Sequence, residues 1–178
     1  MITDVSARAR AVDRRTALAL ALLVVVLAVP YLLRGPKLFL DDWWVLRNRH
    51  FSGVLGAAGH QQAVSRPGAW LVFTGAFGLI GRHPVPLYVL QTALNAAIAA
   101  SLFLVLRRFV TWGLATAVVV VRALLPNHSA MDHWASTLAI VVALLLLLVG
   151  AVLLIRACDG DGHPWAAIAL LIWSKSNP

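Results

Sequence analysis

The chain has 178 residues, of which 61% are hydrophobic and only 12% are charged. A soluble domain carries roughly 45–50% apolar and about 25% charged residues, so this composition excludes a water-soluble globule and a disordered or collagen-like chain. Fifteen Lys and Arg stand against seven Asp and no Glu, for a net charge of +8. Because these bases flank apolar segments, they indicate membrane orientation and anionic lipid partners and not nucleic acid. We therefore predict an all-α, polytopic transmembrane helical bundle.

The N-terminal third of the chain contains one clear span and one long polar segment. Residues 1–15 are polar and basic and are predicted to be cytoplasmic. The apolar run 16–33 covers about 27 Å as a helix, close to the hydrocarbon thickness of about 30 Å. A secretory signal peptide is the alternative, but no cleavage site of the A-x-A type follows the run. Within the polar outer loop 34–83, the apolar stretch 68–81 has the length of an interfacial or re-entrant helix.

Three further spans are predicted, over residues 84–106, 109–125 and 136–155, and another apolar run starts at 166–173. Residues 16–178 together would form the transmembrane domain. If 68–81 does not cross the membrane, then Arg107, Arg108 and Arg156 share the cytoplasmic side with the N-terminus, in keeping with the positive-inside tendency. The loops 34–83 and 126–135 then share the outer side.

An acidic pair, Asp41 and Asp42, follows the first span and precedes two tryptophans. At a membrane surface, such a carboxylate is able to act as a general base on an acceptor hydroxyl or to bind a cation. The alternative is a solvated loop pair in which Trp43 and Trp44 belong to an aromatic belt at the headgroup level. Composition alone leaves both interpretations open.

Other polar residues of the outer side are candidates for ligand binding. Arg47, Arg49 and Arg66 are suited to bind a lipid-linked phosphate bidentately, or simply to anchor the loop at lipid headgroups. His128 and Asp132 are four residues apart and share a face if the segment is helical, where they and His133 would be possible metal ligands. No metal and no other cofactor is predicted, because scattered loop histidines seldom form a site.

Arg122 lies inside an apolar run, where a charge is costly without a partner. It either extends toward the outer surface or pairs with Asp132, Asp41 or Asp42. Cys158 is the single cysteine, which excludes an internal disulfide. The short DGDG sequence after it lacks the rest of a calcium-binding loop.

The order of these motifs resembles the N-terminal part of the GT-C glycosyltransferases that use polyprenyl-phosphate sugars, especially the O-mannosyltransferase and lipid-A-sugar transferase types. The family's acidic pair in the first outer loop is matched by Asp41-Asp42, and its basic-Pro motif by Arg66-Pro67. A Pro-x-His motif with a later Trp is matched by residues 126–134, and a Ser-Lys motif by Ser174-Lys175. Three residues of these motifs are replaced: Leu125 stands for a His that precedes the Pro, and Ala130 and Ser176 each stand for a Glu.

The resemblance implies a bacterial-type inner-membrane enzyme that transfers a sugar from a polyprenyl-phosphate donor to an acceptor on the outer face. It implies that Asp41 or Asp42 is the catalytic base and that substrate is bound by Arg47, Arg49, Arg66, His128, Asp132 and Lys175. Family members have more spans, so we expect this chain to be a fragment of the full enzyme. The alternative is a non-catalytic small membrane protein, either a subunit or a component that carries the lipid-linked sugar.

Overall fold

The computed structural model describes residues 2–34, 67–80, 83–125 and 137–160, together with 165, 168–169 and 172–173; the side chains it describes begin at Ala11 and omit Phe77. The main elements are the helices α1 (Ile2–Leu33), α4 (Pro67–Ile80), α5 (Pro84–Leu106), α6 (Trp112–Leu124) and α8 (Leu138–Cys158). No strand occurs among these described residues. The predicted all-α fold class is confirmed.

Three segments are long and apolar enough to cross a membrane. They are Ala11–Leu33, Pro84–Leu106 and Leu138–Cys158, with mean hydropathies of 2.6, 2.0 and 3.4. With 21 to 23 residues each, these helices measure about 31–35 Å, enough for a hydrocarbon core of about 30 Å. The helix bounds of α5 coincide with the span predicted over 84–106.

The third predicted span, 109–125, is shorter in the structure. Helix α6 covers only Trp112–Leu124, about 20 Å. The preceding residues form a turn in which the amides of Arg108 and Val110 donate hydrogen bonds to the carbonyls of Val105 and Leu106. Two consecutive arginines followed by this turn reverse the chain before the next helix begins.

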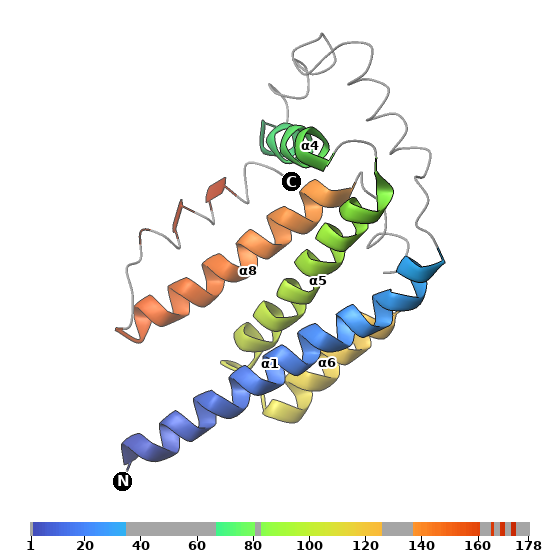
Figure 1. The fold of residues 1–178 in the computed structure, drawn as a ribbon. Coiled ribbons are helices and arrows are strands. Elements are labelled where there is room, and N and C mark those ends of the chain that lie inside the picture. The colour runs from blue at the N-terminus through green and yellow to red at the C-terminus, as the bar shows by residue number, and fades with distance from the viewer. Residues whose placement is uncertain are drawn as a thin grey trace.

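Helices α1, α5, α6 and α8 run side by side with alternating directions, and α5 contacts the other three (Figure 1). We call one end of this bundle the Arg107 end; it holds the start of α6 and the end of α8. The opposite end is the His83 end, where α5 and α8 begin and α1 and α6 finish. The short helix α4 is viewed nearly end-on in Figure 1, so it crosses the bundle, beside the first turns of α5 and α8.

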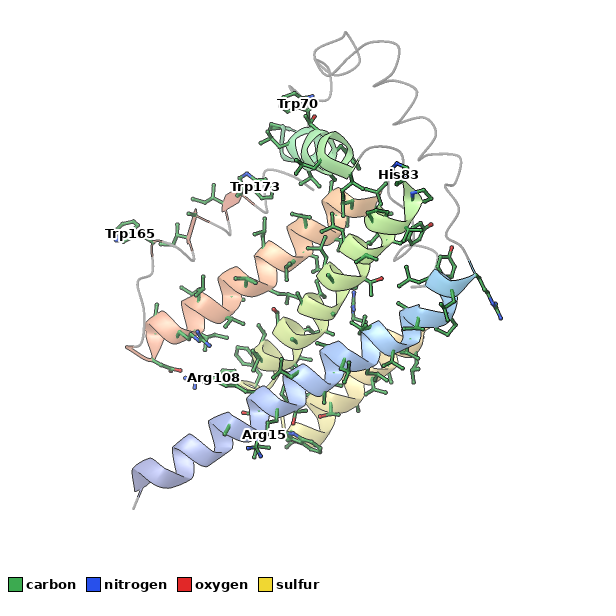
Figure 2. All side chains as sticks on the ribbon, in the orientation of Figure 1. Arg15, Trp70, His83, Arg108, Trp165 and Trp173 are labelled. Carbon is green, nitrogen blue, oxygen red and sulfur yellow. The ribbon has the colours of Figure 1, made fainter. Side chains whose placement is uncertain are left out.

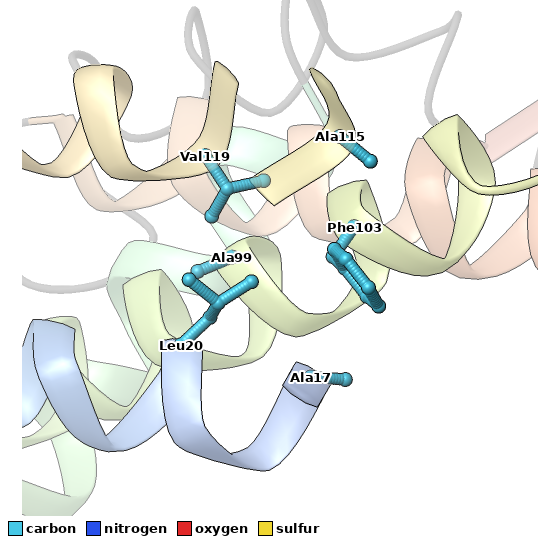
Figure 3. Close-up of a cluster of buried hydrophobic side chains, with 6 residues drawn as sticks. All are labelled: Ala17, Leu20, Ala99, Phe103, Ala115 and Val119. Carbon is cyan, nitrogen blue, oxygen red and sulfur yellow. The ribbon is translucent and has the colours of Figure 1, made fainter. Parts of the chain in front are cut away.

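Small side chains bring three helices together near the Arg107 end. Figure 3 shows the cluster, which consists of Ala17 and Leu20 of α1, Ala99 and Phe103 of α5, and Ala115 and Val119 of α6. Alanines at a helix interface allow close backbone approach, which favours van der Waals packing in a membrane protein. A second cluster, made of Ile98, Val141 and Leu148, joins α5 to α8.

Candidate functional site

The residues predicted to carry chemistry lie outside the described residues. This holds for the candidate base residues Asp41 and Asp42 and for the candidate ligands Arg47, Arg49, Arg66, His128, Asp132 and Lys175. The structure does describe the residues that flank two of these segments. Arg34 and Pro67 flank residues 35–66, and Leu125 and Thr137 flank residues 126–136. All four flanking residues lie toward the His83 end of the bundle, where His83 and Trp70 are seen in Figure 2.

Helix α5 carries a line of buried polar side chains in the half that faces the His83 end. Gln91, Thr92 and Asn95 are 2%, 8% and 3% exposed. Together with the buried Tyr88, these residues follow the i, i+3, i+4, i+7 spacing of one helix face. The face is directed into the bundle, which is where polar residues of membrane helices serve binding or helix association.

The polar face of α5 contacts three neighbouring helical segments. The ring of Tyr88 packs against Tyr31 of α1, with centroids 5.6 Å apart. Gln91 Nε2 donates a hydrogen bond of 3.0 Å to Thr137 Oγ1, the residue directly before α8. Asn95 Oδ1 accepts a longer hydrogen bond of 3.5 Å from Nη2 of Arg122 in the last turn of α6. The face therefore links all the helices of the bundle near the His83 end.

Among the described residues, Arg122 has a neutral hydrogen-bond partner in Asn95. The carboxylates that the sequence led us to expect as partners, Asp41, Asp42 and Asp132, lie outside the described residues, so pairing with them stays a prediction. The described part of the structure shows that the guanidinium is held inward against α5.

An arginine within an apolar helix is costly to insert into a membrane. A central arginine costs about 2.5–3.5 kcal/mol on the insertion scale. Its favourable interaction with the C-terminal dipole of α6 amounts to only about 0.3–1 kcal/mol at an exposed helix end. The helix dipole and one neutral hydrogen bond offset part of such a cost.

Sequence reasoning missed the buried polar face of α5. Its signal was present, since Gln91, Thr92 and Asn95 recur with helical spacing inside the otherwise apolar run 84–106. Interior polar residues in a transmembrane segment are functional candidates by default. The overall hydropathy of the run masks this spacing, so the run was predicted as a plain span.

The Arg107 end carries ion pairs that the sequence analysis also did not identify. Arg107 Nε lies 2.9 Å from Asp13 Oδ1 of α1, and Arg108 contacts Asp159 after α8. Trp112 Nε1 donates a hydrogen bond of 3.1 Å to Thr16 Oγ1. These contacts bring residues of α1, of the turn after α5 and after α8 to one end of the bundle.

Within the described ranges, no group of three His, Cys, Asp or Glu side chains is placed to hold a metal ion. The proposed metal ligands His128, Asp132 and His133 lie outside these ranges. The possibility of a metal site in the 126–136 segment therefore stays untested.

No protein-family model matches the chain, and comparisons with curated proteins and with solved structures returned no match.

Proposed function

We propose that the protein is a GT-C-like membrane glycosyltransferase that transfers a sugar from a polyprenyl-phosphate donor, with its reaction site at the His83 end. The observation that carries this proposal is a convergence of residues. The segments holding Asp41, Asp42 and His128 connect to the bundle at the His83 end, and the buried polar face of α5 lies in the same half. The donor is lipid-linked, so a membrane-embedded polar site is where its headgroup meets an acceptor.

The outer loop contains both an acidic pair and several arginines, and this combination supports such chemistry. Sugar transfer from a polyprenyl phosphate requires a base that takes the proton of the acceptor hydroxyl and cations that stabilise the departing phosphate. In the proposal, Asp41 or Asp42 is the base, and Arg47, Arg49 and Arg66 hold the phosphate bidentately. The auxiliary binding residues are His128, Asp132 and Lys175.

The Arg107 end is assigned to the cytoplasm in this proposal. Arginines gather at or beside it, among them Arg14, Arg15, Arg107, Arg108 and Arg156. Arginines close to the ends of spans orient a membrane protein with that side inward. The His83 end then faces the outer side of a bacterial-type inner membrane, where a lipid-linked sugar meets its acceptor.

A transfer assay with the protein in proteoliposomes and a radiolabelled polyprenyl-phosphate sugar tests the proposal. We expect Asp41→Asn or Asp42→Asn to lower the transfer rate by about a hundredfold or more, as loss of a general base does. Asp159→Asn is the matched control, because it removes a carboxylate at the opposite end of the bundle. Donor binding is expected to stay near the parental value in all three variants.

Transfer at the parental rate in both single variants and in the double variant would show that the acidic pair is not the catalytic base and would overturn the proposed site. Binding of the donor without any transfer by the parent protein would instead favour a subunit or a carrier of the lipid-linked sugar.

A further inference from the structure

The guanidinium of Arg122 lies beside the middle of α5, a helix long enough to cross a membrane. Its partner Asn95 is the central residue of α5, with eleven residues on either side, so about 16 Å of helix separates it from each end. Side chains on an α-helix lean toward its N-terminus. For Arg122 that direction is toward the Arg107 end, and the bond to Asn95 agrees with it. The guanidinium is therefore held at depth and is not extended toward the His83 end.

Two ends of described chain segments lie near the contact between Arg122 and Asn95. Helix α6 finishes at Leu124, two residues after Arg122, and Thr137 before α8 contacts Gln91, one helical turn from Asn95.

The described carboxylates do not neutralise this arginine. Asp13 and Asp159 lie at the Arg107 end, where they are paired with Arg107 and Arg108. Of the five N–H donors of a guanidinium, the structure directs one to the neutral oxygen of Asn95. The remaining donors form a planar fork whose geometry suits two oxygens of a phosphate.

The surface of α6 beside Arg122 is apolar and open. Leu114 and Val118 precede Arg122 at intervals of four residues and so share its face, and they are 53% and 42% exposed. Val121, which is 56% exposed, adjoins this stripe. A hydrocarbon chain lying along the stripe would place a group attached to its end against the guanidinium.

The geometry points to Arg122 as an anion-binding residue that takes the phosphate of a membrane lipid, with the lipid's hydrocarbon chain along Leu114 and Val118 of α6. The same chemistry is offered by two sources, a polyprenyl phosphate and the headgroup of an anionic phospholipid. This inference does not rest on the proposed glycosyltransferase activity, because lipid binding at Arg122 is measured without any transfer.

The test measures lipid binding to the purified full chain by native mass spectrometry or thermophoresis. The probes are farnesyl phosphate and dioleoylphosphatidylglycerol, and farnesol serves as the probe without phosphate. Arg122→Gln keeps a donor for Asn95 but removes the charge, and we expect it to weaken binding of the phosphate probes about tenfold or more, as the loss of a bidentate charge-assisted contact does. Arg34→Gln is the matched control, since Arg34 is an exposed arginine at the end of α1.

A second variant, Asn95→Asp, tests the same inference if Arg122→Gln does not fold. Asn95→Asp places a carboxylate against Arg122, which satisfies the charge within the protein, so the fold is expected to be kept while binding falls by a similar factor. A preference of about tenfold for farnesyl phosphate over the phospholipid assigns the site to a polyprenyl carrier, and equal affinities assign it to bulk anionic lipid. Both results support the inference.

Parental affinity in the Arg122 and Asn95 variants would overturn the inference. An equal loss of binding in Arg34→Gln would also overturn it, because the effect would then be one of general surface charge. If Asp132→Asn reproduces a stability loss of Arg122→Gln and lipid binding is unchanged in both, the partner of Arg122 is that carboxylate and no lipid site exists.

Discussion

Asp13 of α1 accepts a hydrogen bond of 2.9 Å from Nε of Arg107, which lies 94 residues later in the turn after α5. The same guanidinium donates from Nη1 to the carbonyl of Val110 at 3.0 Å. One arginine therefore fixes the turn between α5 and α6 and ties that turn to α1. The two side chains are about a quarter exposed, so the ion pair is only partly screened by water.

This ion pair is expected to stabilise the bundle modestly. Asp13→Asn and Arg107→Gln should each lower the free energy of unfolding by about 1 kcal/mol, the upper range for accessible pairs. Equilibrium unfolding in mixed detergent micelles measures the change. The exchanged double variant Asp13→Arg with Arg107→Asp should recover part of the loss, and failure of both single variants to shift the transition would show that the contact contributes nothing.

Phe103 is predicted to be the residue whose truncation costs the most in the core near the Arg107 end. Its side chain is fully buried against the alanines of α1, α5 and α6, and Phe→Ala in a packed core costs about 3–5 kcal/mol. Phe109→Ala is the matched control because Phe109 is 73% exposed. Equal unfolding free energies for the two alanine variants would contradict the packing shown in Figure 3.

The Gln91–Thr137 hydrogen bond is expected to couple α5 to the start of α8. In a double-mutant cycle of Gln91→Leu and Thr137→Val, we expect a coupling energy of about 0.6 kcal/mol, the average for hydrogen bonds between membrane helices. The measurement is again equilibrium unfolding. Strictly additive single effects would show that the two side chains act independently.

The exposed thiol of Cys158 reports the orientation of the bundle. Cys158 is the single cysteine of the chain and is exposed at the Arg107 end. If that end is cytoplasmic, as we propose, a membrane-impermeant maleimide should label it in inside-out vesicles and spare it in intact spheroplasts. A Cys158→Ser, Arg34→Cys variant moves the thiol to the His83 end and should show the reverse pattern. Labelling of both positions from one side would contradict the bundle arrangement.

The sequence predicted the long helices well because their limits are set by local chemistry. Helix α5 begins at Pro84, whose ring suits the first position of a helix, and ends before two arginines. The start of α6 was placed three residues early, since hydropathy cannot distinguish an apolar turn from an apolar helix at Phe109 and Val110. The hydrogen bonds of that turn decide the boundary.

The contacts between helices were beyond sequence reasoning. Whether Arg122 faces Asn95 or a carboxylate depends on how α6 is rotated about its axis relative to α5. Because successive residues of a helix are about 100° apart around that axis, an error of one residue in the packing changes the partner. The candidate catalytic residues came from loop motifs and a family resemblance, and they lie outside the described residues. The burial of the polar face of α5 depends on the neighbouring helices that cover it, which the sequence alone does not place.

The core cluster has a consequence for the order in which the protein is made. Leu20 of α1 finds its contacts only when Ala99, Phe103 and Val119 exist, and synthesis of the intervening residues takes about 5–20 s at the usual rate of elongation. During that interval α1 must remain in the bilayer by its own mean hydropathy of 2.6. Helix α5 is the least apolar of the three candidate spans at 2.0, and it is made when α1 is already present for Ala99 and Phe103 to pack against. The earlier helix thus acts as an insertion partner for the later one.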